Sequence, residues 1–173
     1  MLRDQAGERI WRDHNGSNVD WFTDGIFGGE SQSSIASISD GSSNVVFASE
    51  VLSGKDDCSI NGDLVIDIRG VWSHFLPGSS WFTNLNTPNT SIGDGCAVGG
   101  AGRQWATGDL DPRLPVSIEL QYHDYHAAAR SGHPGGVQAA FGDGHVSFVS
   151  DTVDTNPWRL LGSAIDGQVV QLP

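Results

Sequence analysis

The stretch Arg130-Ser-Gly-His-Pro-Gly-Gly-Val-Gln-Ala-Ala-Phe-Gly-Asp-Gly-His-Val-Ser-Phe-Val149 decides the fold of this chain. Apolar residues alternate with other residues on both sides of Asp143-Gly144, which is the pattern of a β-hairpin. We expect these two residues to form a two-residue type I′ turn, because both central positions of that turn need a positive φ. The stretch therefore predicts two antiparallel strands joined at Asp143 and Gly144.

A two-residue loop would fix which residues of the two strands face each other. It pairs Phe141 with Val146, and Ala139 with Phe148. The apolar side chains of both strands then share one face of the hairpin. We expect that face to pack against the interior of the domain.

His133 lies ten positions before Asp143. A strand rises about 3.3 Å per residue, so the two residues should be on the order of 25 Å apart. A catalytic His–Asp pair between them is therefore not expected. We expect His133 to be a structural hydrogen-bonding residue that approaches Asp151 to Asp154, near the end of the second strand.

Composition favours one domain of the α+β class over residues 1–173, loop-rich and built mainly on an antiparallel sheet. Hydrophobic residues make up only 38% of the chain and 23 residues are glycine, which disfavours a helical bundle. Besides the hairpin, the strands that we predict span residues 44–50, 64–72, 116–122 and 169–170. A short helix is predicted over 156–161, with Thr155 or Asn156 as its cap and Pro157 in its first turn. Residues 77–115 are predicted to form a long segment with little regular structure.

The charge balance narrows the possible partners. The chain has 9 Lys+Arg against 21 Asp+Glu, a formal net charge of −12. Such a chain repels phosphate backbones and anionic lipid surfaces, so nucleic-acid binding and membrane contact are not expected. The negative charge instead favours binding of calcium or of a basic partner protein. No stretch approaches the 18 or so apolar residues that a transmembrane helix needs.

The two cysteines, Cys58 and Cys96, lie in polar loops rich in Gly and Asp. Their spacing does not form a C-x-x-C redox or zinc motif. We expect a disulfide between them that closes a long loop and stabilises the fold by roughly 3–4 kcal/mol. That bond would place the protein in an oxidising compartment. Two unpaired thiols are the alternative.

Two groups of residues are candidates for metal ligands. His123, His126 and His133 could supply nitrogen ligands to Zn²⁺ or another transition metal, although an extended strand would point the first two to opposite faces. Loop oxygens could bind calcium. The calcium candidates are Asp56, Asp57, Asn61 and Asp63. Their pattern is not an EF-hand, and turn formation explains most of the Asp-Gly pairs in this chain.

Signals for an enzyme are missing from the sequence. No G-x-S-x-G elbow, phosphate-binding loop or dinucleotide fingerprint occurs, so we expect no catalytic activity. Exposed aromatic side chains could form a sugar-binding platform, although such residues more often anchor loops or the core. The aromatic candidates are Trp72, Trp81, Phe82 and Trp105.

Four blocks of the chain share their pattern with a bacterial family. They comprise residues 24–27 and 38–44 with Glu50, residues 70–72 and 87–89 with Cys96, residues 129–137 with Phe141, Asp143 and Gly144, and the closing helix from Pro157 to Leu161. Over residue 24 to the C-terminus, the chain resembles the prepilin-like proteins that are abundant in planctomycetes and end in an H-X9-DG domain of unknown function. The H-X9-DG block corresponds to residues 129–149.

The resemblance implies a pilin- or pseudopilin-like head domain, here without the N-terminal hydrophobic helix, that is extracellular or on the cell surface, or periplasmic. It implies a non-enzymatic structural or interaction role, as in type II secretion or type IV pili, with protein partners or self-assembly. The family's motif residues are then structural: Arg130, His133, Pro134, Gly135, Gly136, Asp143 and Gly144. A calcium- or carbohydrate-binding extracellular module is the first alternative, with a glycan as its ligand, and a metal-dependent hydrolase is the second.

Overall fold

The computed structural model describes residues 2–3, 9–12, 18–19, 25–27, 34–54, 58–60, 63–65, 67, 69–73, 78–94, 111–115 and 126–170. Of the strands before residue 20 and between 58 and 65, it describes the backbone only. Within these residues, no helix is long and apolar enough to cross a lipid bilayer.

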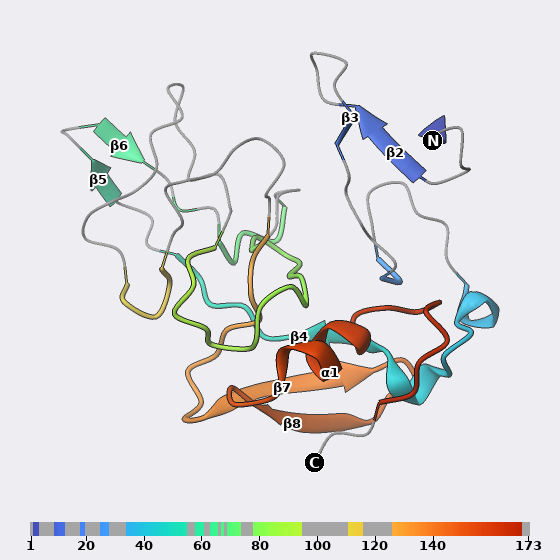
Figure 1. Ribbon diagram of the computed structural model, residues 1–173. Helices are drawn as coiled ribbons and strands as arrows, with labels where there is room; N and C mark the ends of the chain where they lie inside the picture. The colour runs from blue at the N-terminus through green and yellow to red at the C-terminus, as the bar shows by residue number, and fades with distance from the viewer. Residues whose placement is uncertain are drawn as a thin grey trace.

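The strands of the described residues form three small antiparallel sheets (Figure 1). The first sheet has the order β1-β2-β3, with strands Leu2–Arg3, Arg9–Arg12 and Asn18–Val19. The second has the order β4-β7-β8, with strands Val46–Ser49, Gly136–Phe141 and Val146–Ser150. The third pairs β5, Cys58–Ile60, with β6, Asp63–Val65. The expected class, an antiparallel sheet with a short helix and many loops, is what the structure shows.

The helical elements among the described residues are all short. Two 3₁₀ turns, η1 at Ile35–Ser37 and η2 at Ser42–Asn44, lead into β4. The α-helix α1, Thr155–Leu160, follows β8 and lies across one face of the β4-β7-β8 sheet (Figure 1). Its cap is Asp154, so the expected cap at Thr155 or Asn156 was wrong by one or two positions. Pro157 still lies in the first turn, where its missing N–H has no partner to lose.

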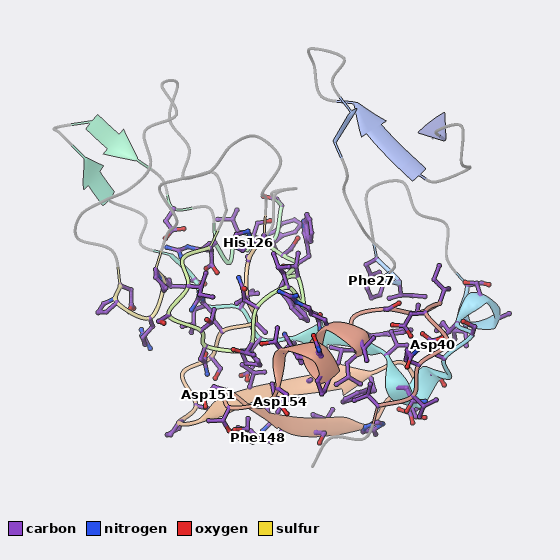
Figure 2. All side chains as sticks on the ribbon, in the orientation of Figure 1. Phe27, Asp40, His126, Phe148, Asp151 and Asp154 are labelled. Atoms are coloured by element: carbon purple, nitrogen blue, oxygen red, sulfur yellow. The ribbon has the colours of Figure 1, made fainter. Side chains whose placement is uncertain are left out.

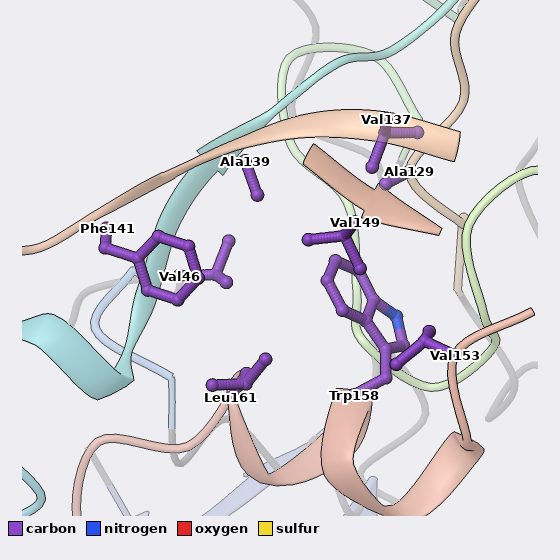
Figure 3. Close-up of a cluster of buried hydrophobic side chains, with 9 residues drawn as sticks. All are labelled: Val46, Ala129, Val137, Ala139, Phe141, Val149, Val153, Trp158 and Leu161. Atoms are coloured by element: carbon purple, nitrogen blue, oxygen red, sulfur yellow. The ribbon is translucent and has the colours of Figure 1, made fainter. Parts of the chain in front are cut away.

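The main core lies between this sheet and α1 (Figure 3). Trp158 of α1 is fully buried and points at the sheet, where Val137 and Val149 face each other across β7 and β8. The buried residues of the cluster are Val46, Ala129, Val137, Ala139, Phe141, Val149, Val153, Trp158 and Leu161. The apolar face of the sheet is thus covered by α1 together with residues from the neighbouring loops, among them Val153 and Phe82.

The hairpin forms, but its register differs from the expected one by one residue. Val137 pairs with Val149 and Ala140 pairs with Val146. The loop therefore has three residues, 142–144: the N–H of Gly144 donates to the carbonyl of Phe141 at 2.9 Å, and only Gly144 of the loop has a positive φ, of 91°. This is a three-residue loop closed by a left-handed glycine, not a type I′ turn.

The shift in register moves two apolar side chains to the other face of the sheet. Val146 and Phe148, expected in the core, are 62% and 47% exposed. A slip of one residue exchanges the faces of a whole strand, because side chains alternate. Val149 takes the inner position instead and is buried.

Two of the other predicted strands differ from the structure. One is shorter than expected, and the other does not form. The strand expected over 64–72 is confirmed only at β6, and residues 69–70 and 72–73 form turns. Gly70 there has a φ of 78°, which ends extended structure. Residues 169–170, expected as a final strand, are irregular. The strand expected over 116–122 lies outside the described residues. The described parts of the segment 77–115, which was expected to be irregular, contain turns but no helix or strand.

Candidate functional site

The loop that leads into β7 is tied to β4 by one glutamate. The Nε2 atom of His133 lies 3.1 Å from Oε1 of Glu50, and the N–H of Gln138 donates to Oε2 of the same carboxylate at 2.7 Å. The carbonyl of Glu50 accepts from the N–H of Arg130 at 2.8 Å. The imidazole thus bonds to Glu50 and not to the aspartates at 151 and 154 that we expected. One residue at the end of β4 therefore holds both ends of the loop.

Asn89 clamps the same loop from the other side. Its Oδ1 accepts from the N–H of Ser131 at 2.9 Å, and its Nδ2 donates to the carbonyl of Gly136 at 3.1 Å. The Ser131 hydroxyl donates to that carbonyl as well, at 2.6 Å. Asn89 has a φ of 50°, a left-handed conformation that asparagine tolerates better than most residues. Asn89 therefore joins the segment around Pro88 to the start of the hairpin.

At Gly136, the first residue of β7, the two strands of the hairpin lie too close together to leave room for a side chain. Substitution of this glycine tests how much the close packing contributes to stability. A Cβ atom at Gly136 would lie 2.2 Å from the carbonyl oxygen of Val149 and 2.7 Å from the ring of Phe148. We expect Gly136→Ala to reduce the free energy of unfolding by about 1–3 kcal/mol or more, because backbone must move. Urea denaturation followed by circular dichroism measures it.

Gly132→Ala is the matched control, because a Cβ there meets no atom within 4 Å. It should leave the urea midpoint close to that of the wild type. Equal midpoints for the two variants would show that the loop yields to the added methyl group.

A buried cluster of four charges joins this hairpin to the irregular half of the domain. The Asp94 carboxylate accepts from Arg130 at 2.8 and 2.9 Å, from Nη1 of Arg69 at 3.2 Å and from the N–H of Ala128 at 3.0 Å. Asp67 bonds to Arg69 at 2.6 Å. All four charged side chains are at most 2% exposed, and their formal charges cancel.

The two guanidinium groups also donate to backbone carbonyls of neighbouring loops. Arg130 bonds to the carbonyl of Thr90 at 2.7 Å and to that of Ile92 at 3.0 Å, and Arg69 bonds to that of Pro115 at 3.2 Å. A planar fork of five donors suits this role. The cluster therefore fixes loops without regular structure. Arg130 was expected to be structural, whereas Arg69, Asp67 and Asp94 were missed by sequence reasoning.

The other end of β7 carries a separate Asp–His pair. Asp143 Oδ1 lies 2.6 Å from Nδ1 of His145 and accepts from the N–H of the same residue at 3.0 Å. These hydrogen bonds, the backbone one first, lower the pKa of the Asp143 carboxyl. The imidazole stacks on Phe141 with 4.3 Å between ring centroids. His133, which precedes β7, and Asp143, which follows it, thus bond to different residues.

The Asp40 carboxylate fixes the segment after α1 through hydrogen bonds. Its carboxylate accepts from the Ser39 hydroxyl at 2.8 Å, from the N–H of Gly167 at 2.8 Å and from that of Asp166 at 3.0 Å. Burial alone would raise the pKa of this carboxyl, but the hydrogen bonds from Ser39, Gly167 and Asp166 together lower it.

Acidification should therefore weaken the fold through Asp40. Because its folded-state pKa is lowered, its contribution is complete above the usual pKa of about 4 and is lost as the pH falls through the lower folded value. We expect Asp40→Asn to cost about 1–3 kcal/mol at pH 7. The difference between variant and wild type should shrink below pH 4 in urea denaturation. A difference that stays constant between pH 6 and pH 2 would contradict this account.

The candidate metal ligands do not meet within the described residues. His126 Nε2 lies 3.1 Å from the carbonyl of Gly93, and His133 bonds to Glu50. In the part of the chain that the structure describes, no three His, Cys, Asp or Glu residues form a group able to hold a metal ion. Asp63 lies in β6, with only its backbone described. His123, Asp56, Asp57 and Asn61 lie outside the described residues.

The cysteine pair and the aromatic platform are only partly described. Cys58 lies in β5, whereas Cys96 lies outside the described residues, so the disulfide stays a prediction. Phe82 stacks on Trp158 with 6.3 Å between centroids and thus belongs to the core. Trp72, in contrast, is 85% exposed, and Trp105 lies outside the described residues.

The chain matches the model of a known protein family. A family model described as a protein of unknown function (DUF1559) matches residues 12–156. No curated protein matches the chain, and no solved structure matches it. The matched range covers β4, β7, β8 and the charge cluster, which are the elements that build the site. The chain therefore belongs to this bacterial family of unknown function.

Proposed function

We propose that this domain is a non-enzymatic structural or interaction component that acts outside the cytoplasm. In this proposal it corresponds to the outward-facing domain of a pilin or of a type II secretion pseudopilin, within the prepilin-like H-X9-DG family that the sequence resembles. Its binding partners are other proteins or further copies of the same protein.

The observation that carries the proposal is how the motif uses its charged side chains. Arg130 bonds to Asp94, His133 bonds to Glu50, and Asp143 bonds to His145. Each contact joins two segments of the domain or closes a turn, and the three do not converge. A reaction centre needs its acid, base and nucleophile within hydrogen-bond reach of one substrate atom. This distribution supports a motif that builds a scaffold.

The proposed location rests on the cysteine pair as well as on the resemblance. We propose that Cys58 and Cys96 form a disulfide, which persists only in an oxidising compartment. Mass spectrometry of a digest made without reductant should find the linked pair of peptides. Free thiols at both positions in protein isolated from the native cells would remove this support.

A carbohydrate-binding module is the second candidate, because one aromatic side chain is almost fully exposed. Trp72 is 85% exposed and lies three residues after Arg69, which is fixed in the charge cluster. An aromatic ring held in this way offers a flat apolar face with a polar N–H, which suits sugars as well as proteins. Titration of simple glycans against wild type and Trp72→Ala separates the two candidates.

Localisation of the native protein tests the first proposal. Antibodies raised against the domain should label intact cells of the native bacterium, with no increase after permeabilisation. Labelling that needs permeabilised cells would overturn the extracellular role. Calorimetric titration with Zn²⁺ and Ca²⁺ is the second arm: heat of binding that disappears in His126→Ala or Asp63→Ala would favour a metal-dependent function instead.

A further inference from the structure

Strand β8 forms one edge of the β4-β7-β8 sheet. The carbonyl of His145 accepts from the N–H of Phe141 at 2.9 Å, and hydrogen bonds alternate sides along a strand. The odd-numbered residues of β8 therefore bond to β7. The N–H and C=O groups of Val146 and Phe148 and the N–H of Ser150 therefore point to the open edge of the sheet, whereas the carbonyl of Ser150 accepts from the N–H of Val153 at 3.1 Å.

This edge lacks the features by which proteins usually protect a free strand. Residues 146–150 contain no charged side chain and no proline. Val146 and Phe148, whose backbone groups face outward, also have exposed apolar side chains, 62% and 47% exposed. Among the described residues, their backbone groups have no hydrogen-bond partner beyond β8. An uncharged apolar edge of this kind is a template for an added strand.

Carboxylates lie at both ends of this edge strand. Asp143 precedes β8 and is exposed. Asp151 and Asp154 follow the strand (Figure 2). The imidazole near the first end, His145, is already bonded to Asp143. Together with the net charge of −12, this arrangement favours a partner whose ends are positive.

We infer that the open edge of β8 binds an extended, basic segment of a partner protein, which adds a fourth strand to the sheet. The inference rests on the proposed interaction role. Apolar side chains of the segment would lie beside Val146 and Phe148, and Lys or Arg residues at its ends would lie near Asp143 and Asp151.

A second copy of this chain fits the edge less well. Two β8 strands that pair antiparallel about Phe148 place the Asp143 end of one strand against the Asp151 end of the other. Carboxylates then approach carboxylates, between two molecules that each carry a formal charge of −12. The charge pattern thus favours a basic partner over self-pairing.

Peptide binding tests the inference. The probe is acetyl-Lys-Arg-Val-Thr-Val-Thr-Val-Lys-Arg-amide with a fluorescent label, titrated in fluorescence anisotropy. We expect Phe148→Lys and Val146→Lys to weaken binding about tenfold or more, because a charge protects an edge and repels the basic ends. Ile35→Lys makes the same charge change at a residue that is 71% exposed in η1, and should stay within about twofold of wild type.

Two control peptides and one structural readout complete the test. Glu in place of Lys and Arg, or N-methylation of the central residues, should abolish binding. Hydrogen exchange should show new protection at the amides of Val146, Phe148 and Ser150 when the first peptide is bound. Absence of binding, protection elsewhere, or equal loss in Ile35→Lys would overturn the inference, as would a dimer in ultracentrifugation that Phe148→Lys dissolves. Surface labelling of cells is independent of all these results, so the proposed function can stand if the edge proposal fails.

Discussion

Asp94→Asn should destabilise the domain by about 3–5 kcal/mol, because it leaves two buried arginines with a single carboxylate. Asparagine has nearly the same shape, so the loss reports the charge and not a cavity. Arg69 and Arg130 cannot reach solvent in the folded state, since their side chains are at most 2% exposed. Urea denaturation measures the effect as a lower midpoint with an unchanged m-value.

Arg113→Gln is the control for this result. Arg113 bonds to Asp111 at 2.6 Å, but its side chain is 61% exposed. An exposed ion pair contributes little to stability, so no measurable change in the urea midpoint is expected. If Asp94→Asn were as mild as the control, the four charges would not be what holds the loops together.

Trp158→Ala should cost about 3–5 kcal/mol, the range found when a buried aromatic side chain is removed from a core. Trp158 is fully buried, stacks on Phe82 and donates its indole N–H to the carbonyl of Asn86 at 2.8 Å. The substitution opens a cavity between α1 and the sheet and removes the link to the loop at 82–86. Since a domain is stable by only about 5–15 kcal/mol, a large fraction of the protein would unfold on mild heating.

Trp72→Ala provides the comparison for this substitution. The same change of residue at a side chain that is 85% exposed should alter stability by less than about 0.5 kcal/mol. Differential scanning calorimetry of both variants separates loss of packing from loss of a tryptophan. A similar drop in Tm for the two would mean that Trp72 is covered by structure of its own.

Local patterns in the sequence were enough to find the main elements of the sheet. Alternation around Asp143 and Gly144 predicted the hairpin, β-branched and aromatic residues predicted β4, and Pro157 marked the first turn of α1. Each of these signals lies within a few residues of the element that it predicts. The structure confirms all three elements, with shifts of a few residues at their ends.

The register of the hairpin could not be read from the same pattern. Both parities of β8 contain apolar residues, since Val146 and Phe148 alternate with Ser147 and Val149. Either face of the strand could therefore have been buried. A glycine before Asp143-Gly144 allows a three-residue loop as well as a two-residue one, and packing against Trp158 selects the face that carries Val149.

The charge cluster was beyond the reach of sequence reasoning for a different reason. Arg and Asp residues are usually exposed, and nothing local distinguishes a buried one. Asp94 is 25 residues from Arg69 and 36 residues from Arg130. A single sequence does not reveal contacts across such separations, so three of the four residues were missed.

The clamp formed by Asn89 has a consequence for how relatives of this protein vary. Asn89 binds both Ser131 and Gly136, and these contacts do not depend on how much chain separates residue 94 from residue 126. Insertions and deletions in the family should therefore collect between those two anchor points. The spacing between Ser131 and Gly136 should stay constant from one species to another, because any change of length there would pull the serine and the glycine away from the same amide group.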